Sequence, residues 1–176
     1  MRHEKLVREL WSRALSHGTA AMRLAQLAEH EAKPGPGDEP RKGVLDGPYS
    51  AAILLLAGYC LEMQLKTAFI LHGGTPAYLK LLGHDLERAL KECRRLRFEP
   101  RFSDIDTVLD TLNQGHSRHH FRYESPDAAV LPPPGLMFQA IRSLGLQIAP
   151  MIEGEQPVRF RLPYFDGAVA GSRAPA

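Results

Sequence analysis

The sequence predicts an all-α protein, an up-and-down bundle of about five helices arranged around one buried helix. Residues 48–72 are apolar around almost the whole circumference of a helix, which is typical of a helix contacted on several sides. The stretches on either side repeat apolar residues at steps of three and four, the spacing of helices with one buried face. No pattern of paired strands accompanies them, so helix packing on helix is the expected architecture.

Composition places the chain among ordinary soluble globular proteins. It has 176 residues, 44% of them hydrophobic and 24% charged, and its formal net charge of +2 is too small to indicate nucleic acid. We expect a helical domain over residues 1–152 and an extended arm and tail over residues 153–176. Two cysteines, Cys60 and Cys93, are too few for a disulfide scaffold, so a reducing cytoplasm is the expected location.

Neither a signal peptide nor a membrane span is expected. The N-terminal sequence, MRHEKLVREL, is charged and amphipathic and has no continuous apolar core. The longest apolar run, Ala51–Leu61, is far shorter than the roughly 20 residues that a membrane-spanning helix needs. We therefore predict a soluble protein that makes no membrane contact.

The first two helices are separated by a long loop. Residues 2–31 have apolar residues on one helical face and charged residues on the other, with Gly18 as a candidate interruption. Residues 33–48 are rich in proline and glycine and predict a loop. The central helix then runs from Pro48 to His72, and Gly73-Gly74-Thr75-Pro76 ends it.

Shorter helices complete the predicted bundle. Residues 76–82 fit about one helical turn, and Asp85 opens a helix to Leu96 because a carboxylate there accepts from the unpaired amides of the first turn. Ser103-Asp104 is a typical start for a fourth helix, and residues 135–151 resume helical periodicity. These elements bring the total to about five helices.

The C-terminal part of the chain has a different pattern. Val158, Phe160 and Leu162 alternate with arginines, which predicts an extended arm instead of a helix. Residues after Asp166 are mostly small, and we expect them to form a frayed tail.

The stretch HSRHHFRY, after the fourth helix, is the best candidate for a ligand-binding site. Its candidate residues are His116, Arg118, His119, His120, Arg122 and Tyr123. Arginine offers a planar fork of donors to phosphate, histidine carries a proton near neutral pH, and an aromatic ring can stack on a base. The alternative is a structural role, in which the cations bind the last carbonyl groups of the helix. His116 and His120 are four residues apart, but no acidic residue or cysteine nearby completes a zinc site, so no metal is expected.

Four polar residues are expected to have structural roles within the bundle. Glu62 and Lys66 lie four apart in the favourable order on one helical face, where a buried pair can also act as acid and base. His84 and Asp85 are adjacent and do not face each other on a helix, which favours helix capping. Neither cysteine lies beside a plausible base, and no glycine loop of the phosphate-binding type is present, so we predict no catalytic residue and no cofactor.

These features together resemble the HEPN superfamily. They are the Glu62-to-Lys66 step in GYCLEMQLKTAF, the glycine turn after it, His84-Asp85-Leu86 at the start of the next helix, and the dipeptide Arg122-Tyr123. The resemblance covers roughly residues 48–150. It implies a small helical bundle that dimerises. Many members resemble RNA-cutting toxins or effectors, and others resemble non-catalytic partners that bind nucleotides or RNA.

The chain departs from the catalytic members of that superfamily. They are similar in having an arginine, four to six residues and then a histidine late in the bundle, with the two chains of a dimer bringing these residues together. No histidine follows Arg122, and Arg118 has none at that distance. The one formal match, Arg23 to His30, lies on the first helix. We therefore expect a protein that is not an enzyme of the usual type.

The leading hypothesis is a non-catalytic or atypical HEPN-like homodimer that binds a nucleotide, RNA or a protein partner. The alternative is a metal-independent ribonuclease of the kind found in toxin–antitoxin pairs. In it Arg118 or Arg122 would stabilise phosphate, and a histidine from 116–120 would serve as general acid or base. A second alternative is a structural or interaction protein without a ligand, which docks on another chain through residues 157–165.

Overall fold

The computed structural model describes residues 3–31, 43–118, 121 and 131–152. Every regular element in these residues is helical, so the predicted all-α fold is confirmed. The elements are α1 (Glu4–Glu31), α2 (Ser50–Leu71), α3 (Pro76–Leu82), α4 (Leu86–Arg95), α5 (Ile105–His116), α7 (Pro134–Ile148) and the short 3-10 helix η2 (Ala149–Met151). The predicted arm and tail at 153–176 lie outside the described residues.

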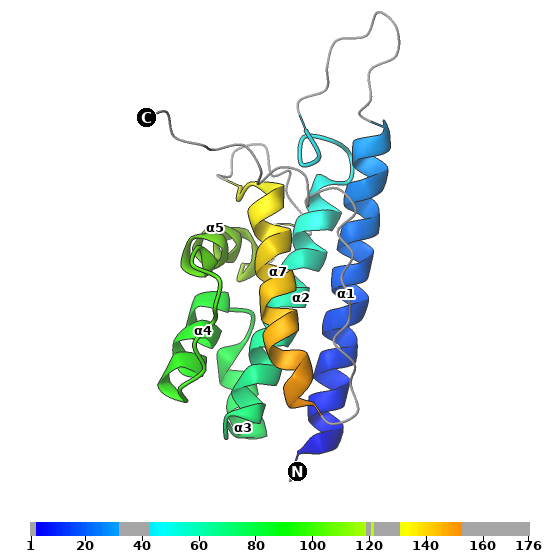
Figure 1. The fold of residues 1–176 in the computed structure, drawn as a ribbon. Helices are drawn as coiled ribbons and strands as arrows, with labels where there is room; N and C mark the ends of the chain where they lie inside the picture. Colours follow the sequence, from blue (N-terminus) through cyan, green and yellow to red (C-terminus); the bar gives the residue numbers. More distant parts are fainter. Residues whose placement is uncertain (1–2, 32–42, 119–120, 122–130, 153–176) are drawn as a thin grey trace, which may run out of the picture.

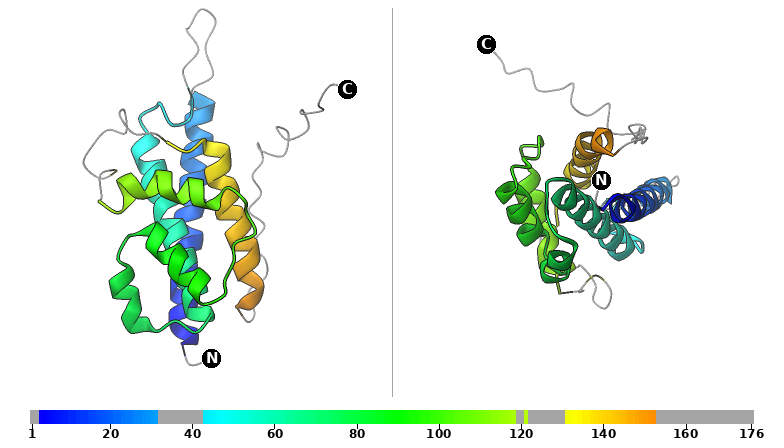
Figure 2. Two further views of the ribbon diagram at one scale, coloured as in Figure 1. Left: turned by 90° about the vertical axis from the view of Figure 1, so that its left-hand side faces the viewer. Right: turned by 90° about the horizontal axis from the view of Figure 1, so that it is seen from below.

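Helix α2 is the centre of the bundle. Seen from below, it has α1 on one side, α4 and α5 on the other, and α7 beside it (Figures 1 and 2). Its sequence explains this position, because buried residues occur at every turn and on all sides, from Ile53 to Ile70. Helices α1 and α2 run in opposite directions, α7 runs in the same direction as α2, and α5 crosses them (Figures 1 and 2).

Small residues on α1 allow it to lie close to α2. Ala14, Gly18, Ala21 and Ala25 are buried along one face of α1. Gly18 does not interrupt α1, which is continuous from Glu4 to Glu31. Gly18 is buried, and its backbone lies against the thiol of Cys60 on α2. The expectation of a division at Gly18 is therefore corrected: a glycine in a helix interior costs about 1 kcal/mol, and burial of the long apolar face offsets this.

The apolar character of α2 comes from its place in the core. Among the described helices it alone is long and apolar enough to cross a membrane, but 72% of its most apolar window is buried inside the bundle. The continuous apolar run, Ala51–Leu61, is shorter than this 18-residue window, because the window also includes the charged residues Glu62 and Lys66. A mostly buried helix of this kind is what the core of a soluble protein provides.

Helices α4 and α5 are joined to each other at the start of α4. Asp85 is the N-cap of α4 and accepts a hydrogen bond from the Arg88 amide at 2.9 Å, as its position in the sequence predicts. Asn113 of α5 accepts from the Leu86 amide at 2.8 Å and donates to Asp85 at 3.1 Å. This contact fixes the end of α5 beside the segment that joins α3 to α4. Asp104 precedes α5 as predicted, but its side chain makes no capping hydrogen bond.

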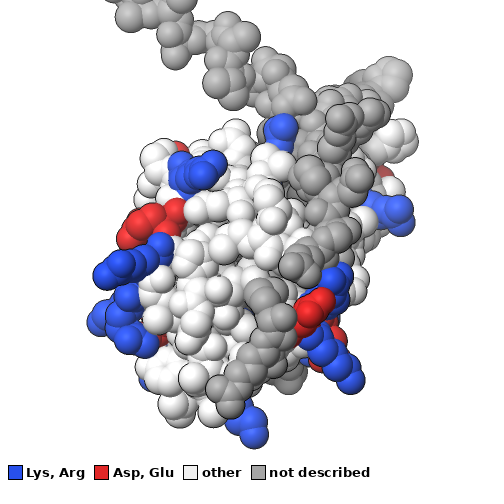
Figure 3. Space-filling model, turned by 60° about the horizontal axis from the view of Figure 1, so that its bottom comes forward, with Lys and Arg blue, Asp and Glu red and all other residues white. Residues whose placement is uncertain are grey.

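The charged side chains do not form one basic surface on the lower end of the bundle. Figure 3 shows Lys, Arg, Asp and Glu mixed around the edge of this face, with uncharged residues filling its middle. This distribution agrees with the small net charge of +2. An anion site on this face would therefore need a local group of cationic side chains, since the face as a whole is not basic.

Candidate functional site

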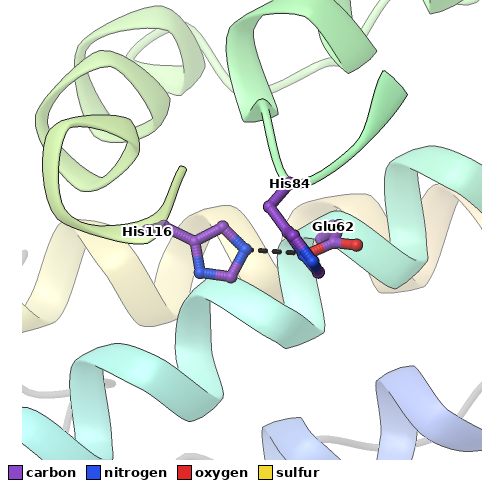
Figure 4. A group of neighbouring side chains, drawn as sticks. All are labelled: Glu62, His84 and His116. Carbon is purple, nitrogen blue, oxygen red and sulfur yellow. Dashed lines mark hydrogen bonds and ion pairs between the residues drawn. The ribbon is translucent and has the colours of Figure 1, made fainter. Parts of the chain in front are cut away.

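A buried carboxylate, Glu62, is the centre of the candidate site. Its side chain is 2% exposed and both of its oxygens are bonded. Oε1 accepts from Lys66 Nζ at 2.6 Å. Oε2 lies 2.9 Å from His84 Nδ1 and 2.8 Å from His116 Nε2 (Figure 4). The four side chains come from α2, from the segment between α3 and α4, and from the last residue of α5. We call these four residues the Glu62 cluster.

Local helix geometry places the first two members. Glu62 and Lys66 lie one turn apart on α2, so their side chains meet on the same face. Lys66 Nζ also donates to the Gly83 carbonyl at 2.7 Å. Gly83 has φ +57° and ψ −132°, a backbone conformation that side chains disfavour. The turn at Gly83 therefore directs its carbonyl group to the lysine and brings His84 to the carboxylate.

The position of His116 depends on a glycine in the facing helix. The His116 ring is 1% exposed and lies against Gly58 of α2. A Cβ atom added at Gly58 would lie only 2.4 Å from His116 Nδ1, so no other residue at 58 leaves room for the ring. His116 Nδ1 is buried and has no hydrogen-bond partner among the described residues. The ring is thus held by its Nε2 contact with Glu62 and by packing.

The contacts keep Glu62 ionised despite its burial. Burial alone would raise the pKa of a carboxyl group, because the charged form loses its hydration. Hydrogen bonds from His116, Lys66 and His84 outweigh burial and lower the pKa of Glu62 to about 2. The cluster therefore contains a carboxylate and an ammonium group that compensate each other within the core.

A surface of aromatic and imidazole rings adjoins the cluster. Tyr59 of α2 lies with its ring centroid 5.0 Å from His116, 6.0 Å from His84 and 5.5 Å from His17 of α1. Tyr59, His84 and His17 are half-buried, and the His84 side chain is 40% exposed. Burial lowers the pKa of His17; the negative charge of Glu62 acts in the opposite direction, and Arg13 lowers it further. We call His17, Tyr59 and His84 the ring surface.

The predicted site residues fall into four groups, one of which is Asp85 alone, the N-cap of α4 outside the Glu62 cluster. Glu62, Lys66, His84 and His116 are brought together, although the sequence interpretation had placed His116 in a separate cationic stretch. Arg118 is exposed, two residues beyond α5, so it does not share the buried environment of His116. Four candidates lie outside the described residues: His119, His120, Arg122 and Tyr123.

Sequence reasoning missed several residues that build the site. His17 and Gly58 were not singled out, and Asn113 and Gly83 were not recognised as positioning residues. A glycine inside the most apolar helix is the one signal that indicated a close approach at 58. Nothing in the sequence indicates which side chain fills that space.

Neither thiol belongs to a reactive site. Cys60 and Cys93 are free and buried, and burial raises the pKa of each to about 12. Cys93 Sγ donates to the Leu65 carbonyl at 3.2 Å. Thiols that stay protonated at neutral pH are poor nucleophiles, so both cysteines have packing roles.

No protein-family model matches the chain, and no curated protein or solved structure is significantly similar to it. The HEPN resemblance therefore stays a prediction from the sequence.

Proposed function

We propose that the chain is a HEPN-like helical module that binds a nucleotide or single-stranded RNA, without cleaving it, at the ring surface. The observation that carries this proposal is the contact of three half-buried rings, His17, Tyr59 and His84, across α1, α2 and the segment before α4. Nucleobases stack on aromatic and imidazole rings, and each stacked base contributes about 1–3 kcal/mol.

Cations near the ring surface support binding of the phosphate. Arg13 is exposed one turn before His17 on α1, close enough to act on its charge state. Guanidinium groups donate two hydrogen bonds to phosphate in a planar arrangement. Arg118 is a second exposed guanidinium and lies two residues after His116, whose ring contacts Tyr59. A base on the rings and a phosphate on an arginine together describe one nucleotide unit.

Fluorescence anisotropy with two probes tests the proposal. A labelled single-stranded RNA and a labelled mononucleotide are titrated at low salt with chelator present. Both probes offer a nucleobase and a phosphate group, so their affinities can be compared directly. We expect Tyr59→Leu to weaken binding about 10-fold, since one stacking partner is removed. Tyr78→Leu is the matched control, because Tyr78 is also half-buried but stacks on Phe69, with ring centroids 5.7 Å apart.

Three results would overturn the proposal. One is that the wild type binds neither probe, which would favour a structural or interaction role. Another is that Tyr59→Leu and Tyr78→Leu weaken binding equally, which means the ring surface is not the site. The third is RNA cleavage by the wild type but not by the Arg122→Ala variant, which would favour the metal-independent ribonuclease. The HEPN resemblance also predicts a homodimer, which light scattering after size-exclusion chromatography tests.

A further inference from the structure

Three potential metal ligands converge at the Glu62 cluster. Glu62 offers a carboxylate oxygen, and His84 and His116 each offer one imidazole nitrogen. The three ligand atoms all lie within 4.8 Å of one another, and they come from α2, from the segment before α4 and from the end of α5. Ligands that are far apart in the sequence and meet at one point form a site that the tertiary fold builds.

The spacing of these atoms fits a small divalent ion. Zinc and related ions bind imidazole nitrogen and carboxylate oxygen at about 2.0–2.2 Å, so neighbouring ligand atoms lie about 3 Å apart. Glu62 Oε2 is 2.8 Å from His116 Nε2 and 2.9 Å from His84 Nδ1. The two imidazole nitrogens that now donate hydrogen bonds to Oε2 can bind one ion together with it, once they lose these protons and the two rings move slightly.

The surroundings of the carboxylate resemble the outer shell of a metal site. Lys66 holds Oε1 at 2.6 Å and is itself held by the Gly83 carbonyl, so only Oε2 faces the two imidazoles. Hydrogen bonds to the non-ligating oxygen orient a ligating carboxylate in this way. The ammonium group of Lys66 also repels a metal ion at Oε2, which limits the affinity of the site for the metal.

One side of the cluster is accessible to an ion. Glu62 and His116 are almost completely buried, whereas the His84 side chain is 40% exposed. Three protein ligands with an open side allow water or another molecule to complete the coordination. Two histidines and one carboxylate suit zinc, cobalt or iron better than magnesium or calcium, which prefer oxygen ligands alone.

We propose that Glu62, His84 and His116 form a binding site for a divalent transition-metal ion such as Zn²⁺. This inference goes beyond the proposed nucleotide or RNA binding and does not rest on it. It also differs from a zinc site built on His116 and His120, because the ligands here are the acidic and imidazole groups that the fold brings to one point.

Titration of the untagged, metal-stripped full chain with Co²⁺ tests the site. Co²⁺ replaces Zn²⁺ and reports its ligands through visible absorption, so binding is seen directly and without RNA. We expect one Co²⁺ per chain, displaced by Zn²⁺, and at least about 10-fold weaker binding in His84→Ala. His84 is a suitable position for substitution because it lies outside the helices and is partly exposed; circular dichroism checks that the variant is folded.

Two control variants make the result specific. His30→Ala, in the last turn of α1, and the double variant His119→Ala/His120→Ala should bind Co²⁺ as tightly as the wild type. Absence of binding by the wild type, or equal binding by His84→Ala, would overturn the proposal. So would loss of binding in the double variant, since it would assign the ion to residues 119–120. Co²⁺ binding by a wild type that binds neither the RNA nor the mononucleotide would leave this inference intact and remove the proposed function.

Discussion

Two ion pairs with the same shortest distance lie in very different parts of the molecule. Lys66 and Glu62 meet at 2.6 Å inside the bundle, with side chains 11% and 2% exposed. Arg94 of α4 and Asp106 of α5 also meet at 2.6 Å, with a second bond of 2.7 Å, but their side chains are 37% and 61% exposed. The distances alone do not distinguish them.

The two pairs differ in whether water can solvate one charge when its partner is removed. Water replaces the partner of an exposed charge, so a surface pair contributes only about 0–1 kcal/mol. A buried charge has no such replacement, and removing its partner costs about 3–5 kcal/mol. We therefore expect loss of either partner of the buried Glu62–Lys66 pair to be costly, and loss of a partner of the Arg94–Asp106 pair to be tolerated.

Removal of Lys66 should have the largest effect. We expect Lys66→Met to lower the free energy of unfolding by about 3–5 kcal/mol, because the Glu62 carboxylate and the Gly83 carbonyl lose their shared donor. Urea denaturation measures this. The double variant Glu62→Gln/Lys66→Met should lose less than the sum of the single losses, since it leaves no buried unpaired charge. Simple additivity would mean that the two side chains do not depend on each other.

Acid should remove the contribution of Glu62 next. Its pKa is lowered on folding from 4.5 to about 2, so the stabilisation is complete above pH 4.5 and is lost as the pH falls towards 2. The shift corresponds to about 3 kcal/mol. We expect the unfolding free energy, measured with chelator present, to fall over this range in the wild type and to fall less in Glu62→Gln. Identical pH profiles would contradict this assignment.

A substitution at Gly58 tests the packing of His116. Gly58→Ala places a Cβ atom where the His116 ring lies, at 2.4 Å from Nδ1, so the ring must move away from Glu62. We expect a loss of about 1–3 kcal/mol, measured by thermal or urea unfolding. Gly47→Ala is the matched control, since a Cβ atom there meets nothing within 4 Å and the residue has no positive φ. Equal stability of the two variants would show that the helices adjust around the ring.

The smallest effect is expected at the exposed pair. Arg94→Met should lower the unfolding free energy by less than about 1 kcal/mol, even though it removes two short hydrogen bonds. This difference from Lys66→Met should widen further as salt is added, because ions screen the exposed charges more than the buried ones. If Arg94→Met lowered the unfolding free energy as much as Lys66→Met, burial would not explain the difference expected between the two pairs.

Local sequence patterns predict most of the helices and the central place of α2. Apolar periodicity, the glycine turn after α2 and the carboxylate of Asp85 act over a few residues, so the helices and their ends can be predicted from local patterns. The pairing of Glu62 with Lys66 is local too, because four residues make about one helical turn. The all-α bundle followed from the same periodicity.

The contacts of Glu62 with the two histidines depend on helix packing and could not be predicted from local patterns. His84 lies 22 residues from Glu62 in the sequence and His116 lies 54 residues away, and helix packing brings both rings to the same oxygen. His116 is the last residue of α5, and its direction is set by Gly58 on the facing helix and by the hydrogen bonds of Asn113, also on α5, with the start of α4. Local pattern cannot encode that direction, because it depends on the crossing of two helices and on the space that a missing side chain leaves.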